Sequence, residues 1–263
     1  MLRVGVIGHG AIAQYLAAAL PGIGAELVLA ITRPGRGEVA KNALGPNVRT
    51  AEALGLARPD VVVDCAGHEG LRQHGADILR AGVPLITVSI GALSDDALHQ
   101  ELTKAAQVGR TALHLSTGAI GGLDALASAR VGSLQSVTYT GRKPPAGWKG
   151  SPAEEVLDLD ALTAEAATHF EGSARDAAAQ YPKNANVAAA VAIAGVGFDN
   201  TRVSLIADPN VHANIHEIHA TGDFGELTFT ISGKTLPGNA RTSALAAMSV
   251  VKMVAGQNAA IGF

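Results

Sequence analysis

The first 115 residues alternate apolar runs with amphipathic segments, and this rhythm restricts the possible folds more than any other feature of the chain. The apolar runs are almost free of polar interruptions and occupy residues 2–8, 25–32, 60–67, 83–90 and 110–116. Unbroken runs of this length are typical of parallel strands that are buried on both faces. Amphipathic stretches that predict helices lie near 11–21, 69–82 and 94–108. We therefore predict an α/β domain of the Rossmann type, in which helices cover a doubly wound parallel sheet.

The rhythm changes after about residue 116. Strands are predicted over 133–141, 201–207, 211–220 and 225–232, and helices over 159–181 and 184–196. The last three of these strands alternate polar and apolar residues, which is typical of antiparallel strands with one face packed under helices. A loop rich in Gly and Pro follows the first strand at 141–152. The second part of the chain is therefore predicted to be an α+β domain on a mainly antiparallel sheet.

A glycine motif joins the first predicted strand to the first predicted helix. The sequence VGVIGHGAIA places Gly8, Gly10 and Ala13 in a GxGxxA pattern. In this context Gly8 allows the tight turn, and Gly10 lets a pyrophosphate approach the backbone. The start of the following helix, Ala11 and Ile12, would then face the anion with its positive end. A glycine-rich turn without a ligand is the alternative, but the strand–turn–helix context favours a dinucleotide site.

The end of the second predicted strand bears on the choice between NAD and NADP. An NAD-preferring site usually has an acidic residue here for the ribose 2′-hydroxyl. The segment Ile31–Arg36 contains no carboxylate, whereas Thr32 could bond a hydroxyl and Arg33 or Arg36 could meet a 2′-phosphate. We expect the chain to use NADP, or both cofactors, unless these arginines are simply solvated.

Small residues end the third strand, at Cys65, Ala66 and Gly67. Ligands of doubly wound sheets bind outside the carboxyl ends of the strands, so Ala66 and Gly67 are expected to border the cofactor. Cys65 is read as a small buried residue rather than a nucleophile, since no base can be assigned to it.

Two domains are expected from this organisation. Residues 1–116 and 240–263 are predicted to form the dinucleotide-binding domain, with a final helix over 240–254 packing back on it. Residues 117–239 are predicted to carry the catalytic groups, the substrate and the oligomer contact.

Charge and cysteine content exclude some classes of protein. Twenty basic residues stand against 23 acidic ones, and the net charge is −3. This balance, without a basic run, argues against a nucleic-acid partner. Cys65 is the single cysteine, which favours a reducing compartment, and no apolar stretch reaches the ~18 residues of a membrane span. We expect a cytoplasmic protein with a small-molecule substrate and neither a nucleic-acid nor a membrane partner.

The segment NIHEIHA (214–220) combines two histidines with an asparagine and a glutamate. In a strand, Asn214, His216 and Ile218 project to one side, and Glu217 and His219 project to the other. His216 and His219 therefore cannot share a metal, and we expect no metal site. We expect helices to cover the face of Glu217 and His219, which leaves His216 on the open face. His216 is then an acid–base candidate, with a structural histidine as the alternative.

Two further turns can reach a ligand. The glycine-rich segment 115–126 connects the first predicted domain to the second, and its backbone is expected to line a cleft between the domains. In YPKNANVAAAV (181–191), Asn184 is a candidate N-cap, and Asn186 in the first turn can offer its amide to a ligand. The alternative gives both asparagines a capping role only.

Several of these segments, taken in order, resemble the bacterial L-aspartate dehydrogenase family. They are GHGAIA, CAGHEG, SIGALSD, STGAIGGLDAL, YTGRKPP, YPKNANVAA and NIHEI, and together they span nearly the whole chain. The resemblance implies NAD- or NADP-dependent oxidation of L-aspartate to iminoaspartate, which hydrolyses to oxaloacetate and ammonia. The imine can also feed NAD biosynthesis.

The resemblance also implies roles for particular residues. The active-site histidine of the family falls on His216, and its cofactor-contacting alanine and asparagine fall on Ala119 and Asn186. The partners of the two substrate carboxylates stay open among Arg142, Lys143 and Lys183. A homodimer is expected from the resemblance and from Ile206 and Ile218, which are apolar residues on otherwise polar strand faces.

Two other functions are weighed against this one. A cyclic-imine reductase of the dihydrodipicolinate reductase type shares the two-domain plan, but its paired-histidine motif with a downstream lysine is not visible here. A non-catalytic dinucleotide-binding sensor would normally add a partner-binding module, and two domains already account for the 263 residues.

Overall fold

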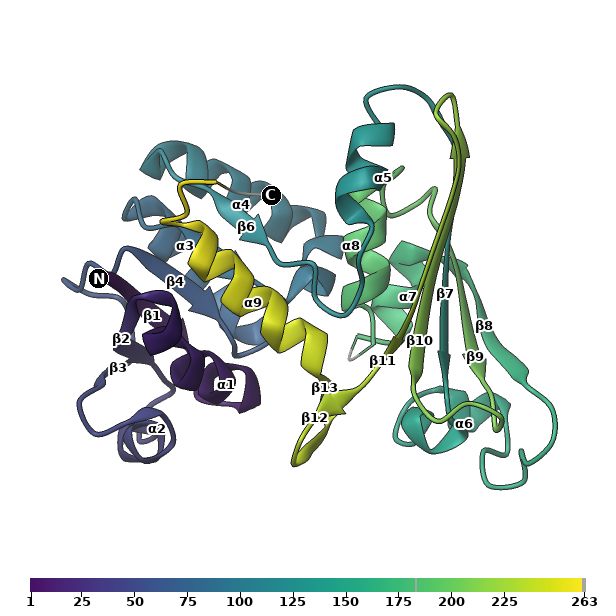
Figure 1. Cartoon of the computed structure of the whole chain (residues 1–263), viewed down its shortest axis with the longest axis horizontal. Helices are drawn as coiled ribbons and strands as arrows, with labels where there is room; N and C mark the ends of the chain where they lie inside the picture. Colours follow the sequence, from purple (N-terminus) through teal and green to yellow (C-terminus); the bar gives the residue numbers. More distant parts are fainter. Residues whose placement is uncertain (183, 262–263) are drawn as a thin grey trace. The chain divides into compact units, whose positions relative to one another are not determined.

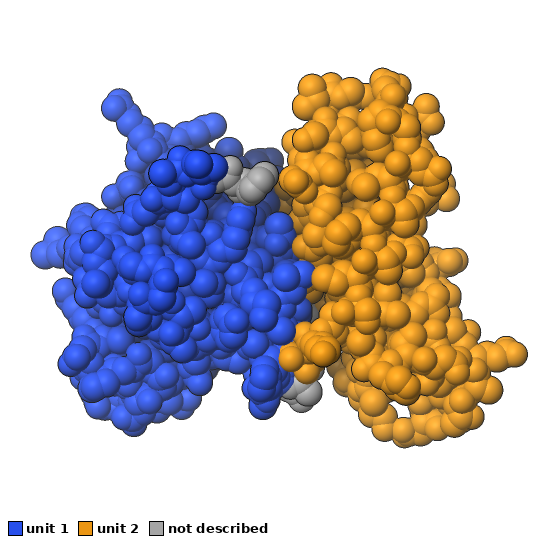
Figure 2. Space-filling model, viewed as in Figure 1, with its two compact units in different colours: residues 1–118, 236–263 blue, residues 119–235 orange. Residues whose placement is uncertain are grey.

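The computed structural model describes residues 1–182 and 184–261 of the chain. Two compact units are present. Unit 1 contains Met1–Gly118 and Leu236–Phe263, and unit 2 contains Ala119–Thr235 (Figure 2).

Unit 1 is built on a sheet of six parallel strands in the order β3-β2-β1-β4-β5-β6 (Figure 1). The strands are β1 (Leu2–Ile7), β2 (Ala25–Ile31), β3 (Arg49–Ala51), β4 (Val61–Asp64), β5 (Leu85–Thr87) and β6 (Leu113–Leu115). The strand order reverses at β1, which pairs with β2 on one side and with β4 on the other. A ligand crevice is expected outside the carboxyl ends of strands at such a reversal. The predicted doubly wound sheet is confirmed.

Helices surround the sheet of unit 1 (Figure 1). They are α1 (Ala11–Ala19), α2 (Gly37–Leu44), α3 (His68–Arg80), α4 (Asp96–Gly109) and α9 (Ala244–Gly256). Asp95 caps α4, because its side chain accepts from the backbone N–H groups of Ala97 and Leu98. The final helix closes the unit, since Val250 and Val254 are buried in one core with Val4 and Val6 of β1.

Neither α2 nor β3 was predicted from the sequence. The helix follows a glycine-containing turn and is short, and β3 pairs with β2 through Arg49–Ala51 alone. Segments of this length carry too few apolar repeats to reveal their period.

Unit 2 is built on a mixed sheet in the order β11-β10-β7-β9-β8 (Figure 1). The strands are β7 (Leu134–Lys143), β8 (Ala167–Ser173), β9 (Arg202–Ala207), β10 (Asn214–Gly222) and β11 (Gly225–Gly233). The β7–β9 pair is parallel, and the three other pairs are antiparallel. A small two-stranded sheet joins β12 (Thr235–Leu236) to β13 (Asn239–Ser243). The mainly antiparallel second sheet is confirmed.

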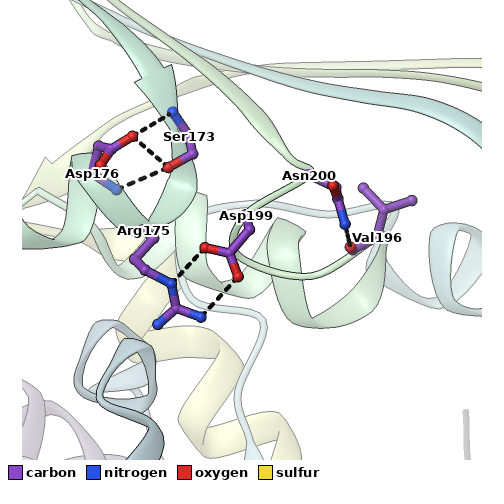
Figure 3. Close-up of polar contacts among 6 residues, drawn as sticks. All are labelled: Ser173, Arg175, Asp176, Val196, Asp199 and Asn200. Carbon is purple, nitrogen blue, oxygen red and sulfur yellow. Dashed lines mark hydrogen bonds and ion pairs between the residues drawn. The ribbon is translucent and has the colours of Figure 1, made fainter.

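The helices of unit 2 are α5 (Leu123–Ala129), α6 (Ala153–Val156), α7 (Ala174–Gln180) and α8 (Asn186–Ala194). The helix predicted over 159–181 is wrong in its first part, because β8 occupies Ala167–Ser173 at the edge of the sheet. Pairing with β9 outweighs the helical propensity of this alanine-rich stretch. Ser173 and Asp176 then form a capping box at the start of α7, and Arg175 donates two hydrogen bonds to Asp199 (Figure 3).

The two faces of β10 are the reverse of the sequence-based expectation. His216, Ile218 and Ala220 are buried, whereas Glu217 and His219 are only partly covered. Across the strand pairs, Ile218 faces the buried Tyr139, which in turn faces the buried Val203. Residues 211–220 carry apolar side chains on both faces, so only the neighbouring strands decide which face is covered. The expectation that His216 lies on an open face was wrong.

No helix among residues 1–182 and 184–261 is long and apolar enough to span a membrane.

Candidate active site

The β1–α1 turn of unit 1 is shaped for close approach of a ligand. Gly8 has a φ of 86°, and a Cβ on it would lie 3.1 Å from the Cβ of Ala66. Only glycine fits this left-handed and crowded position. Gly10 is the N-cap of α1 and has no side chain with which to cap the helix. The backbone N–H groups at Ala11 and Ile12 are therefore left for an external acceptor.

The conformation and surroundings of Gly10 indicate whether this turn can accommodate a dinucleotide. Its φ of −75° is open to any residue, and the nearest atom to a Cβ built there is the carbonyl oxygen of Cys65, at 4.0 Å. The glycine is thus required neither by backbone strain nor by packing. A bare backbone at a helix N-terminus, which a Cβ would obstruct, suits a pyrophosphate.

A buried carboxylate fixes the neighbouring loop Cys65–Gly67. Asp64, at the end of β4, is fully buried and accepts hydrogen bonds from the Thr87 hydroxyl at 2.8 Å and the Ser89 hydroxyl at 2.5 Å. It also accepts from the backbone N–H of Ala66 at 3.0 Å. Burial raises the pKa of Asp64 despite these hydrogen bonds. The loop that holds Ala66 beside Gly8 is therefore positioned from within the core.

The other unit 1 residues singled out from the sequence differ in accessibility. Thr32 is 5% exposed, whereas Arg33 is exposed just beyond the end of β2. Arg33, like the exposed Arg36 in the same loop, is therefore accessible where a ribose 2′-substituent is recognised in this fold. Burial, together with the charge of Asp64, raises the pKa of Cys65 well above its ordinary value. This agrees with the reading that the thiol is no nucleophile.

His216 lies on the covered face of the unit 2 sheet. Its side chain is 6% exposed, and its Nδ1 lies 2.8 Å from the Tyr139 hydroxyl on β7. Gly141 faces His216 across the same strand pair. A Cβ on Gly141 would lie 2.8 Å from the Tyr139 hydroxyl. The missing side chain at position 141 leaves room for the tyrosine–histidine hydrogen bond.

The electrostatics of this pair define its protonation state. Burial and, to a smaller extent, the positive charge of Lys143 lower the pKa of His216 to about 4. Burial raises the pKa of Tyr139. At neutral pH the pair is therefore a neutral imidazole and a protonated phenol. With the ring proton on Nδ1, the histidine donates to the tyrosine oxygen and its Nε2 can accept a proton.

Lys143 lies at the end of β7, which runs further into the stretch that the sequence predicted as a loop. Its Nζ donates to the side-chain oxygen of Asn184 at 2.5 Å and stands 4.5 Å from the centre of the Trp148 ring. Burial lowers the pKa of Lys143 to about 8. The prediction that Asn184 caps α8 was wrong, because Ala185 occupies the N-cap and Asn184 binds the lysine instead.

Several aromatic side chains pack together beside this lysine. His169 packs edge-on against Trp148 with ring centres 4.3 Å apart, and its Nδ1 lies 3.1 Å from the Tyr181 hydroxyl. Burial and the charge of Lys143 lower the pKa of His169 to about 4. Sequence reasoning did not single out Tyr139, Trp148 or His169. The alternation in residues 133–141 predicts the face of the strand on which Tyr139 lies, but it does not predict which strand pairs with this one.

The remaining predicted residues take different positions. Ala119 is half-buried in the turn before α5, and Asn186 is half-buried as the first residue of α8. Arg142 projects to the opposite face of β7 from Lys143 and pairs with Asp208 at 2.6 Å. Lys183 lies outside the described residues. No three His, Cys, Asp or Glu side chains among the described residues gather closely enough to hold a metal ion.

Comparison with protein families assigns both parts of the chain. Residues 124–257 match the model of the aspartate dehydrogenase C-terminal domain. Residues 4–116 match the NAD-binding domain of homoserine dehydrogenase. The L-aspartate dehydrogenase of Ruegeria pomeroyi is 58% identical over 262 residues, which cover 99% of this chain and 94% of that one. The chain belongs to the L-aspartate dehydrogenase family.

Further members of the family support the assignment. The L-aspartate dehydrogenase of Cupriavidus necator is 46% identical and covers 99% of both chains. Among solved structures, the aspartate dehydrogenase of Thermotoga maritima superposes with a TM-score of 0.78 at 25% identity, over 100% of this chain and 99% of that one. The family resemblance inferred from the sequence motifs is therefore confirmed.

Proposed function

We propose that the chain catalyses the NAD(P)-dependent oxidation of L-aspartate to iminoaspartate, followed by hydrolysis to oxaloacetate and ammonia. In a member of this family, the observation that carries the proposal is the buried, neutral His216 held by Tyr139. A histidine kept neutral at working pH can take a proton during the reaction.

The glycine turn of unit 1 supplies the cofactor site. Gly8, Gly10, Ala11 and Ile12 would hold the pyrophosphate on the N-terminus of α1, while Ala66 and Gly67 border it. When bound there, the cofactor would supply the hydride acceptor for the oxidation at Cα of L-aspartate. Ala119 and Asn186 are assigned to the same cofactor through the resemblance of their motifs. Arg33 favours use of NADP, because a guanidinium can pair with a 2′-phosphate.

His216 acts on the imine. Its Nε2 takes a proton from a water molecule as the water oxygen bonds to the imine carbon, and the resulting imidazolium returns this proton to the nitrogen, which gives a carbinolamine. The imidazole then moves the hydroxyl proton of the carbinolamine to the nitrogen, so that the C–N bond breaks and oxaloacetate and ammonia are released. The hydrogen bond between Tyr139 and Nδ1 holds the orientation of the ring and keeps the ring proton on Nδ1, so that Nε2 is the nitrogen that accepts a proton. A phenol stabilises the imidazolium less than a carboxylate does, which is consistent with a histidine of low basicity.

Initial rates test the proposal directly. Nicotinamide reduction is measured with L-aspartate, L-glutamate, L-alanine and D-aspartate, each with NAD and with NADP. We expect turnover with L-aspartate alone. His216→Asn keeps a polar side chain of similar size, and we expect it to lower kcat at least ~100-fold while NADPH affinity stays unchanged. An unchanged kcat in this variant would remove His216 from the mechanism.

Cofactor choice is tested separately through Arg33. Replacing Arg33 with Ala is expected to raise the KM for NADP about tenfold and to leave the KM for NAD unchanged, because only NADP has the 2′-phosphate. Arg36→Ala tests the second candidate arginine of the same loop. A cytoplasmic location and a homodimer stay predictions that rest on the sequence.

A further inference from the structure

Lys143 carries a positive charge in an unusual position. It lies on the same face of β7 as Tyr139, whose hydroxyl meets His216. His216 pairs with Gly141 in the register of β7 and β10, so Lys143 is its diagonal neighbour. Diagonal neighbours on adjacent strands lie roughly 7–8 Å apart. The ammonium group of Lys143 therefore belongs to the surroundings of His216.

The charge of Lys143 has neutral partners. Its ammonium donates to the amide oxygen of Asn184 and stands over the ring of Trp148. The nearby His216 and His169 are neutral at pH 7, because their pKa values are lowered to about 4. Among the described residues, no carboxylate oxygen lies within 4.0 Å of the Lys143 Nζ. A cation that has lost part of its hydration is normally paired with an anion.

The neighbouring cationic side chains form ion pairs with carboxylates. Arg142 pairs with Asp208 on the opposite face of the sheet, at 2.6 Å. Lys149, in the same connection as Trp148, pairs with Asp160 at 2.5 Å. The segment from 142 to 149 thus contains three cations, of which Lys143 is the one without a carboxylate partner in the described part of the chain.

We propose that Lys143 binds one carboxylate of the dicarboxylate substrate beside His216, with Asn184 and Trp148 holding the ammonium in place. The inference rests on the proposed function and assigns a substrate ligand within it. The trans-strand position of Lys143 brings the anchored substrate to the histidine, and the amide of Asn184 orients the ammonium while leaving two of its protons for the carboxylate. Because its pKa is about 8, the group is mostly cationic at pH 7.

The test uses Lys143→Met, which keeps the length of the side chain and removes the charge. Lys149→Met is the matched control, because it removes a lysine of the same segment that is paired with Asp160. Two readouts are compared in the full-length protein. One is the KM and kcat for L-aspartate, and the other is the Kd of succinate for the NADPH-loaded protein, measured by calorimetry. Succinate is a dicarboxylate without an amino group, so its binding does not require turnover.

We expect Lys143→Met to raise both the KM for L-aspartate and the Kd of succinate by ~10- to 100-fold, the range of a lost hydrogen bond to a charged group. The Kd of NADPH and both values in Lys149→Met should stay within twofold of the wild type. Lys143→Arg should recover part of the succinate affinity.

Two results would overturn the inference. The first is a lower kcat with unchanged KM and unchanged succinate affinity, which would make Lys143 a proton acceptor. The second is a loss of NADPH affinity alone, which would assign the lysine to the cofactor. Succinate binding that depends on Lys143 in a protein without L-aspartate turnover would contradict the proposed function and leave the carboxylate site intact.

Discussion

Tyr139 and Gly141 show how two neighbours position His216, the proposed catalytic residue. The Tyr139 oxygen lies 2.8 Å from Nδ1, and the glycine leaves the space in which the hydrogen bond between them forms. Neither residue stands out in the sequence, since a strand tyrosine is usually a core residue and a strand glycine usually marks a bend. Their roles follow only from the β7–β10 register, which no local pattern encodes.

Removing the Tyr139 hydroxyl should weaken catalysis through the histidine. In Tyr139→Phe, Nδ1 of His216 loses its partner and both tautomers become populated. We expect kcat to fall about tenfold and the KM for the cofactor to stay the same. Long-range proton–nitrogen NMR of the His216 ring should show one tautomer in the wild type and a mixture in the variant.

Gly141→Ala is a second way to break the same hydrogen bond, because the added Cβ would lie 2.8 Å from the Tyr139 hydroxyl. It should reproduce the loss of kcat and the tautomer mixture. Normal activity in both variants would show that Tyr139 has only a packing role.

Buried histidines, among them His216 and His169, should make the protein less stable in mild acid. The pKa values of His216 and His169 are lowered to about 4 in the folded state, against about 6.5 for an unperturbed histidine. Between these values the unfolded chain binds more protons, so the free energy of unfolding falls as the pH drops from about 6.5 to about 4. Each histidine can account for up to ~3 kcal/mol of this fall.

Urea titrations at pH 7.5 and pH 5 measure this effect. His169→Phe removes one titrating ring and should reduce the fall in stability, whereas His99→Gln changes an exposed ring and should not. The raised pKa of Asp64 acts in the opposite direction, and it cancels in the comparison between variants. An equal fall in the wild type and His169→Phe would show that His169 is not the titrating group.

The two glycines of the β1–α1 turn have different roles: Gly8 is required by the backbone conformation, and Gly10 is proposed to leave room for the cofactor. Gly8→Ala would place a side chain at positive φ and 3.1 Å from Ala66, so both the free energy of unfolding and NADPH affinity should fall. Gly10→Ala meets no atom closer than 4.0 Å. It should leave stability within ~0.5 kcal/mol and weaken NADPH binding at least tenfold, because the methyl group occupies the path of the pyrophosphate.

Thermal unfolding and fluorescence titration with NADPH, performed on both variants, distinguish these effects. Full NADPH affinity in Gly10→Ala would mean that the pyrophosphate does not cross this glycine.

The elements of unit 1 could largely be predicted because each long apolar run is a strand and each amphipathic stretch is a helix. The failures have physical causes. Strand β8 lies in an alanine-rich segment whose own propensity is helical, and its pairing with β9 overrides that propensity. The covered face of β10 could not be read from residues 211–220, since Ile215 and Ile218 lie on opposite faces. The fold class was therefore predictable, and His216 stays a prediction for the catalytic group, whereas the neighbours of that histidine could not be predicted.

At the scale of the whole molecule, the sequence-based argument for a dimer needs one change. Ile218 is fully buried within its own unit and cannot contribute to an interface, which corrects that part of the expectation. Ile206 and Ile215 are half-exposed and flank Arg142 in a row across β9, β7 and β10. If a second copy covers this face, the double variant Ile206→Lys/Ile215→Lys should sediment as a monomer.

Sedimentation velocity at several concentrations tests this prediction. The wild type should sediment as a dimer throughout, with the double variant Gln135→Lys/Val131→Lys as a control at exposed positions away from that row. A wild-type monomer at all concentrations would rule out the dimer.

The return of the chain to unit 1 has a consequence for its synthesis on the ribosome. Unit 2 is one continuous segment, so it can fold as soon as residue 235 has emerged. Unit 1 must wait, because Val250 and Val254 of the last helix complete a core that Val4 and Val6 begin. Until then the apolar side chains that this helix covers stay exposed. A premature stop codon before α9 would therefore disrupt unit 1, most of which lies at the opposite, N-terminal end of the chain. Unit 2, which contains His216, could still fold.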